Sequence, residues 1–322
     1  MAFWPFFWTE RETPEGRRWY TIEMLRLFAI ASLAALTAVA PPNDRGRPVI
    51  LLVHGRGMLD SDTAATRKLW FNALTSGTKT ITRDSLIDDR DVRVVWYADV
   101  LDPRSSAGCD YTRNDPRARR DATEDPDLKS FLSLAGNVLG MLTDLLDDTA
   151  AVQLRGLAGD ASFLSDARKR CASENRLAAA IDRARDEGRP VILVAHSLGS
   201  LVAYDYLSAR TDSGVVQRLV TIGSPVGSPA LRRLLIGGDS AERLVRPTSV
   251  KEWINIRNEQ DPFAVPLPIG RDIVTNPPAD EIDPHEMVGY LRSTVATREI
   301  VSGWCQAFVS SRPRGCQDVV AK

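Results

Sequence analysis

The sequence lacks the features that are typical of proteins that bind nucleic acids or metals. Its formal net charge is only −1 over 322 residues, so no basic surface for nucleic acid is predicted. Its three histidines and four cysteines do not cluster at the spacing of metal ligands, so we expect no metal and no other cofactor. The sequence also has no internal repeat, which makes an array of repeated units unexpected.

An apolar stretch long enough to span a bilayer, about 20 residues, is missing as well. The uncharged run Leu27–Ala40 is shorter than this. Arg26 before the run and an Ala-x-Ala pattern at its end are typical of an export signal. The likeness to an export signal is better if translation starts at Met24. Pro41 disfavours cleavage after the run, and a retained run would associate with a membrane through residues 24–40. We therefore expect a protein that is exported or membrane-anchored, on the periplasmic or extracellular side. The alternative interpretation of the apolar run is a helix buried in the core.

The four cysteines all lie outside the predicted strands. Free cysteines are usually buried in cores, so this placement favours disulfide bonds and an oxidising compartment. Chain order suggests the pairs Cys305–Cys316 and Cys109–Cys171, although four cysteines allow three pairings and all three stay open here.

What the sequence does contain is a strand, a sharp turn and a helix around one serine. Val191–Val194 is a branched apolar run, and Ala195-His196-Ser197-Leu198-Gly199 follows before apolar residues take up helical spacing. Small residues must flank such a turn because strand and helix pass close together; Ala195 stands where glycine is commoner. The pattern indicates a nucleophile elbow, which lifts the hydroxyl of Ser197 above the sheet. An ordinary strand-to-helix loop is the alternative.

The segment from Ala195 to Asp205 resembles the nucleophile segment of α/β-hydrolase serine esterases and lipases, above all the lipase-like and phospholipase-like branches with His-Ser-Leu-Gly-Ser. Thr221–Pro225 resembles the strand and loop that follow. The likeness runs from about Val49 to about Val295 and is weak between Asp99 and Cys171. It implies an α/β-hydrolase fold, a mostly parallel sheet with helices on both faces, and the alternation of strands and helices predicts the same layers.

The sequence predicts an N-terminal segment of residues 1–48, with clustered aromatics, the apolar run and a linker, before a hydrolase domain of residues 49–322. An insertion at about 99–173 contains an apolar helical stretch, which predicts either a lid or packing on the sheet. The expected strands are residues 49–53, 91–97, 191–195, 217–222, 251–256 and 272–275; the expected helices are residues 62–74, one capped by Ser173, one after the elbow, and one carrying Met287 to Val295.

By the resemblance, Ser197 is the nucleophile, His285 the general base and Asp261 the carboxylate that orients the base. They occur in the order Ser, Asp, His that this fold uses. Asp272 and Asp283 compete for the acid role: Asp272 lies inside a weak strand, and Asp283 is only two residues from the base.

The choice of His285 also follows by elimination among three histidines. His54 ends the first strand, where the superfamily uses it to hold a loop, and His196 should point away from the hydroxyl of Ser197 on a tight elbow. The alternative for His285 is a surface histidine in a Pro-rich loop.

The turn after the first strand, residues 54–57, is expected to supply one backbone N–H of an oxyanion hole. By motif position the two donors are the N–H groups of Arg56 and Leu198. The residues that support this close turn are His54, Gly55, Gly57 and Gly199. A plain glycine turn is the alternative interpretation.

These residues predict a serine hydrolase of carboxylic esters that forms an acyl-enzyme on Ser197, with a small-molecule or lipid ester as substrate. An acyltransferase or thioesterase would use the same residues and differ in what intercepts the acyl group. A non-catalytic, membrane-anchored binding module on this fold is the alternative outside the enzymes.

Overall fold

A computed structural model describes residues 44–55, 57–59, 61–82, 85–102, 104–112, 162–164, 166–228, 244–276, 283–309 and 312–320. All of them after Asp44 belong to one compact unit, Arg45–Lys322. The apolar run at residues 24–40 and the apolar stretch predicted at residues 131–146 lie outside the described residues. The division of the chain at residue 48 and the lid therefore stay predictions.

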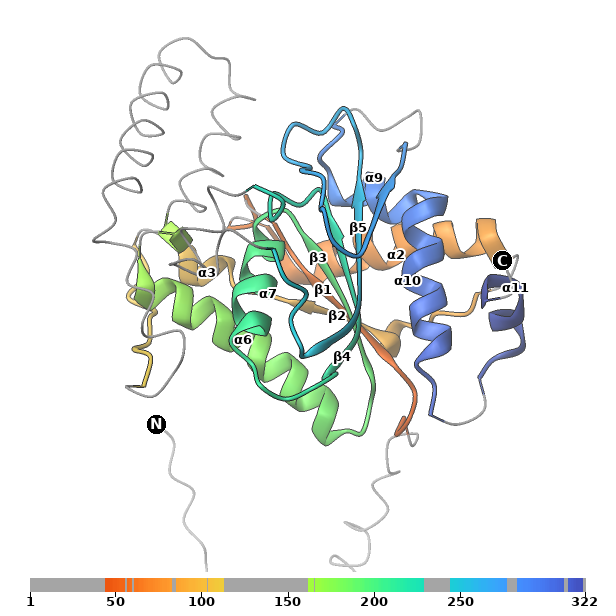
Figure 1. The fold of residues 1–322 in the computed structure, drawn as a ribbon, viewed down its shortest axis with the longest axis horizontal. Helices are drawn as coiled ribbons and strands as arrows, with labels where there is room; N and C mark the ends of the chain where they lie inside the picture. The colour runs from red at the N-terminus through yellow and green to blue at the C-terminus, as the bar shows by residue number, and fades with distance from the viewer. Residues whose placement is uncertain are drawn as a thin grey trace, which may run out of the picture. The chain divides into compact units, whose positions relative to one another are not determined.

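Six parallel strands form the centre of the unit (Figure 1). They are β1 (Val49–Val53), β2 (Val92–Val95), β3 (Val191–His196), β4 (Val216–Ile222), β5 (Val250–Arg257) and β6 (Arg271–Val274). Their order across the sheet is β2-β1-β3-β4-β5-β6, and every neighbouring pair is parallel. Every residue of β1 and β3 is buried, because parallel strands in the middle of a sheet are covered on both faces.

Helices pack on both faces of the sheet (Figure 1). They are α2 (Thr63–Thr82), α3 (Ala98–Leu101), α6 (Ala167–Asp186), α7 (Leu198–Ser208), α9 (Met287–Arg292), α10 (Thr294–Gln306) and α11 (Gln317–Val320), with 3₁₀ turns at Asp89–Asp91 and Arg314–Cys316. Alternate residues of β1 face opposite layers: Leu51 packs in the core of α6 and α7, and Ile50 in the core of α2, α9 and α10. This arrangement confirms the predicted α/β-hydrolase fold class.

Three predicted helix limits are wrong. Ser173 does not cap α6, because the side chain of Asp166 accepts the N–H groups of Arg168 and Lys169 and starts the helix earlier. The Ser173 hydroxyl instead donates to the carbonyl of Lys169 inside the helix. α2 continues past residue 74 to Thr82, and the predicted helix from Met287 to Val295 is divided at Ser293 into α9 and α10.

β1 and β3 are neighbours in the sheet, but the chain runs from β1 to β2 on one side and from β3 to β4 on the other. In open parallel sheets, ligands bind in the crevice outside the carboxyl ends of the strands at such a switch point. His54 directly follows β1 and Ser197 directly follows β3, so both lie at the carboxyl ends of these neighbouring strands.

Two disulfide bonds fasten the edges of the fold. Cys109–Cys171 joins the segment after α3 to α6, and Cys305–Cys316 joins α10 to the turn before α11. These are the pairs that chain order suggested, and two disulfides are typical of proteins from an oxidising compartment. Among the helices of the described ranges, none combines the length and the hydropathy needed to cross a bilayer.

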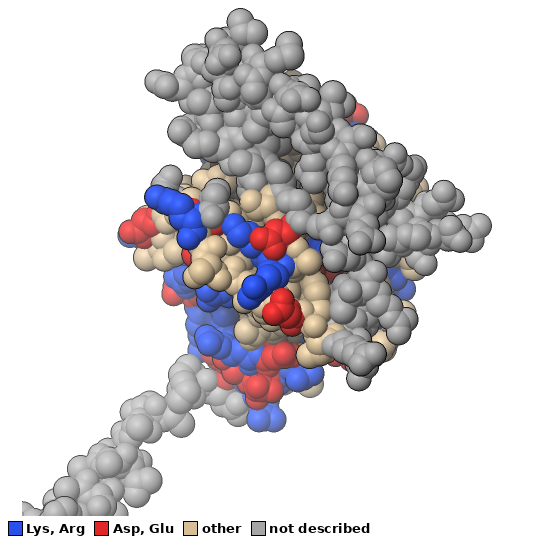
Figure 2. All heavy atoms as spheres, turned by 90° about the vertical axis from the view of Figure 1, so that its left-hand side faces the viewer, with Lys and Arg blue, Asp and Glu red and all other residues tan. Residues whose placement is uncertain are grey.

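The face that carries α3 and α6 mixes positive and negative side chains (Figure 2). Exposed arginines of α6 pair with nearby acids, as in Arg176–Asp99 and Arg185–Asp182. This interspersion agrees with the net charge of −1.

Candidate active site

Ser197 lies on a strained turn between β3 and α7. Its backbone has φ 51° and ψ −126°, and it is the one non-glycine residue with positive φ within the described ranges. Such a conformation costs about 1–3 kcal/mol and persists only where the surroundings enforce it. Gly199 permits close packing, since a Cβ there would lie 2.4 Å from the carbonyl oxygen of His54. The turn therefore has the geometry of a nucleophile elbow.

The hydroxyl of Ser197 starts a hydrogen-bonded chain of three side chains. Its Oγ lies 2.9 Å from Nε2 of His285, and Nδ1 of His285 lies 2.9 Å from both carboxylate oxygens of Asp261. A carboxylate only accepts, so Nδ1 carries the proton and Nε2 is left to accept from the serine hydroxyl. The structure thus brings together three residues from the loops after β3, after β5 and before α9.

Asp261 is buried and receives further hydrogen bonds. The N–H of Phe263 donates to Oδ1 at 2.9 Å, and the hydroxyl of Tyr290 donates to Oδ2 at 2.8 Å. Burial alone raises the pKa of Asp261, but the hydrogen bond and charge of His285, with those two donors, outweigh it and hold the pKa below its ordinary value. The carboxylate is therefore ionised at neutral pH, as a residue that stabilises an imidazolium must be.

Tyr290 is a hydrogen-bond partner of Asp261 that the sequence analysis did not predict. Its periodicity marks it as an apolar position of a helix, and its ring is indeed buried. Its hydroxyl, however, accepts the N–H of Asn258 at 3.0 Å while it donates to Asp261. Burial and the negative charge of Asp261 raise the pKa of Tyr290, so it remains a donor throughout the neutral range. No motif links a tyrosine in this helix to a carboxylate 29 residues earlier.

The two competing acids have other partners. Asp272 accepts from Asn255 at 2.7 Å, from Arg257 at 2.9 Å and from the N–H of Leu267 at 3.2 Å, so it holds the loop between β5 and β6. Asp283 accepts the backbone N–H of His285 at 2.9 Å and shapes the loop before α9. The carboxylate that reaches the imidazole of His285 is that of Asp261.

His54 holds the turn after β1. Its Nδ1 donates to the carbonyl of Gly55 at 2.6 Å, and its Nε2 accepts the N–H of Tyr97 at 3.0 Å. The hydroxyl of Tyr97 donates in turn to the carbonyl of His54, and the two rings stack at 4.0 Å. Burial lowers the pKa of His54 to about 4, against weaker opposing effects of the Gly55 carbonyl and Asp99, so the ring is neutral and both bonds persist.

The two glycines of this turn serve different needs. A Cβ on Gly55 would lie 2.8 Å from Cβ of Ser197, so only glycine lets the turn approach Ser197 this closely. Gly57 has open space around it but a φ of +74°, a conformation that side chains rarely adopt. Arg56, predicted as an oxyanion donor, lies outside the described residues; Leu198, the other predicted donor, is the first residue of α7.

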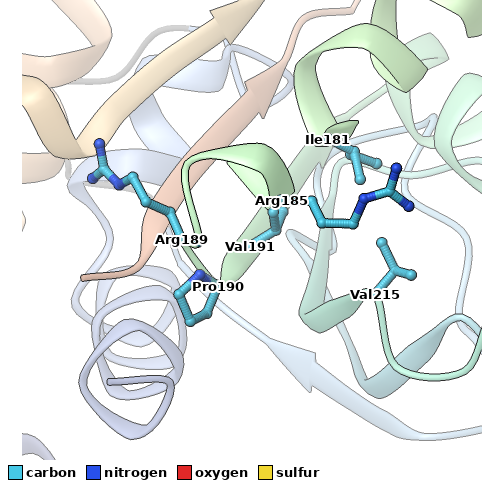
Figure 3. A pocket seen from close by; sticks show the side chains of 7 residues that line it. Ile181, Arg185, Arg189, Pro190, Val191 and Val215 are labelled. Atoms are coloured by element: carbon cyan, nitrogen blue, oxygen red, sulfur yellow. The ribbon is translucent and has the colours of Figure 1, made fainter. Parts of the chain in front are cut away.

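The hollow drawn in Figure 3 belongs to another part of the molecule. It has a volume of about 210 Å³ and lies at the amino end of β3, whereas Ser197 follows the carboxyl end of the same strand. Its lining residues are Ile181, Arg185, Gly188, Arg189, Pro190, Val191 and Val215. As for metals, no group of three or more His, Cys, Asp or Glu within the described ranges could hold one.

Residues 168–279 match the model of the lecithin:cholesterol acyltransferase family. The match covers about a third of the chain and includes Ser197 and Asp261 but not His285. The family's name refers to acyl transfer between a phospholipid and a sterol. No curated protein and no solved structure gave a significant match.

Proposed function

We propose that this protein is a serine hydrolase of carboxylic esters, in which Ser197, His285 and Asp261 act as nucleophile, base and orienting acid. The observation that carries the proposal is the continuous hydrogen-bonded chain of these three side chains, which begins at a serine on a strained elbow. A buried serine hydroxyl bonded to an imidazole has few structural uses that would offset the strain at its backbone.

In the proposed reaction, Ser197 Oγ attacks the ester carbonyl while its proton passes to Nε2 of His285. Asp261 keeps the imidazole in the required tautomer and stabilises the imidazolium that forms. The backbone N–H groups of Arg56 and Leu198 stabilise the developing oxyanion. His285 then protonates the leaving alcohol, and an acyl-enzyme remains on Ser197.

The substrate class that we propose is an acyl ester of a lipid. Its support is the match of residues 168–279 to a family named for acyl transfer from lecithin to cholesterol. The same match favours a second candidate, an acyltransferase, in which an alcohol rather than water releases the acyl group from Ser197. The chemistry up to the acyl-enzyme is common to both.

We also propose that the protein works after export, with residues 1–48 as an N-terminal signal or anchor segment and residues 49–322 as the hydrolase domain. The two disulfide bonds support an oxidising compartment. An enzyme outside the cytosol would meet lipid esters at membrane surfaces.

Labelling with a fluorophosphonate probe tests the nucleophile directly. The full-length protein should be labelled, and Ser197→Ala should not be. Asp261→Asn should lose far more activity toward a soluble ester than Asp283→Asn, and equal losses would overturn the assignment of the acid.

A panel of esters graded by acyl length, with and without micelles, then tests the substrate class. We expect a preference for long acyl chains and activation by micelles. A preference for short soluble esters without such activation would reject a lipid ester as the substrate, while the proposed esterase activity would stand. Product analysis with a labelled acyl donor and a sterol separates transfer from hydrolysis.

A further inference from the structure

His196 is the residue next to the nucleophile, and its imidazole reaches the backbone of the base. It ends β3 and is 8% exposed. Its Nε2 lies 2.7 Å from the carbonyl oxygen of His285. A carbonyl only accepts, so this nitrogen carries a proton and donates it.

The space around this ring is created by glycines of two other loops. A Cβ on Gly55, after β1, would lie 2.8 Å from Nδ1 of His196, and a Cβ on Gly223, after β4, would lie 3.3 Å from its Nε2. The ring of His285 lies 4.8 Å away, centroid to centroid. The imidazole of His196 is thus enclosed where the loop of the oxyanion turn, the loop after β4 and the loop of the base meet.

The bond to the carbonyl ties the main chain of His285 to a strand of the sheet. The N–H of His285 is bonded to Asp283, which belongs to the same short loop. The bond from His196 instead ties the main chain of His285 to β3, the buried strand that carries Ser197. The distance between nucleophile and base therefore depends on a bond donated by the residue adjacent to the nucleophile.

We propose that His196 is a positioning residue of the reaction, which holds the backbone of His285 so that Nε2 stays within hydrogen-bonding distance of Ser197. The proposal rests on the proposed function, because it assigns a role in placing the general base. In this role His196 acts on the reaction through the backbone of His285. A shift of about 1 Å in a catalytic group can cost roughly 100-fold in rate, so the loss of this bond is measurable.

The test compares two substitutions of similar size in the full-length protein. The His196→Gln side chain keeps an N–H donor on a flexible chain, whereas that of His196→Met has no donor. With a soluble chromogenic ester, His196→Met should lower kcat roughly 10- to 100-fold and leave KM within about twofold. His196→Gln should recover most of that loss, although both variants lose the imidazole packing and should unfold at similar temperatures.

A double substitution separates positioning from general stability. In a His285→Ala background there is no imidazole to place, so adding His196→Met should leave the residual rate unchanged. The proposal is overturned if His196→Met keeps the wild-type kcat, if His196→Gln and His196→Met lose activity equally, or if the loss persists in the His285→Ala background. Failure of the proposed function would look different: Ser197→Ala would then remain active.

Discussion

The two ends of the parallel sheet handle charge in opposite ways. At the amino end, Asp91 is fully buried between two arginines: Arg189 at 3.1 Å and Arg47 at 2.5 Å. At the carboxyl end, the buried carboxylate of Asp261 is bonded to the imidazole of His285, which in turn is bonded to Ser197. The first carboxylate is paired with two permanent cations, whereas in the proposed function the second would stabilise the positive charge that forms on His285 during the reaction.

The backbone shows the same contrast. At the amino end, Arg189 donates to the carbonyls of Arg47, Arg90 and Pro48 and so joins the segments before β1 and β2. At the carboxyl end, Ser197 has the strained φ of 51°. Under the proposed function, stability depends on one end of the strands and chemistry on the other, so changes at the two ends should have different consequences.

The largest effect is expected at the carboxyl end. Ser197→Ala or His285→Ala should each lower turnover on the order of 10⁴-fold or more, because each removes a partner of the same proton transfer. The double variant should be no slower than the worse single one. Steady-state rates together with urea unfolding check this, since the free energy of unfolding should change little; a variant that keeps most of its activity would contradict the assignment.

The elements that place these residues were predictable because their signals are local. The unbroken apolar runs at Val49–Val53 and Val191–Val194 predict buried parallel strands, and the elbow motif together with chain order points to Ser197, Asp261 and His285. The structure differs from the predicted limits by one to three residues in most strands, since strand ends depend on the partner's register.

The contacts of Tyr290 and His196 were not predictable, because each is a hydrogen bond between segments far apart in the chain. The hydroxyl of Tyr290 reaches a carboxylate after β5, and Nε2 of His196 reaches a carbonyl 89 residues later. Local sequence describes one as a helix residue and the other as a residue facing away from the nucleophile. The prediction that Ser173 caps α6 was wrong for a local reason. Serine is a good capping residue, but Asp166 lies earlier in the chain and already accepts the free N–H groups at the start of the helix.

At the amino end, Arg189→Met should damage stability and leave chemistry intact. It removes one of the two cations at buried Asp91 and leaves three carbonyls without this donor, so the free energy of unfolding should fall by about 3–5 kcal/mol. Urea unfolding measures the loss, and kcat per folded molecule should not change. Arg185→Met is the matched control, since its pair with Asp182 is exposed and should contribute less than about 1 kcal/mol. Equal effects of the two variants would contradict the contrast.

His54 should make the carboxyl end sensitive to acid. Its pKa is about 4 when folded and 6.5 when unfolded. Between about pH 4 and pH 6.5, His54 is therefore protonated in the unfolded chain but not in the folded chain. The contribution of His54 to the free energy of unfolding is fully present above pH 6.5 and falls as the pH is lowered to about 4. The loss attributable to His54 is about 3 kcal/mol. In His54→Asn, which cannot titrate, unfolding free energies should decline less across this window; a decline parallel to the wild type would show that other groups cause it.

The smallest effect, and the most direct test of how the buried charge is held, is expected for Tyr290→Phe. This substitution removes the hydroxyl that donates to Oδ2 of Asp261 and accepts from Asn258, while the aromatic ring stays in the core. With one donor fewer, the pKa of Asp261 rises and the carboxylate is held less firmly, so kcat should fall about 10-fold with KM unchanged, and the acid limb of the rate profile should move to higher pH. Tyr204→Phe is the control, because it also removes a buried tyrosine hydroxyl, one that donates to the carbonyl of Val245. If both variants lowered stability but only Tyr290→Phe moved the pH profile, the hydroxyl of Tyr290 would act on the carboxylate of Asp261. If the pH profile of Tyr290→Phe did not move, the role of Tyr290 would be limited to packing in the core.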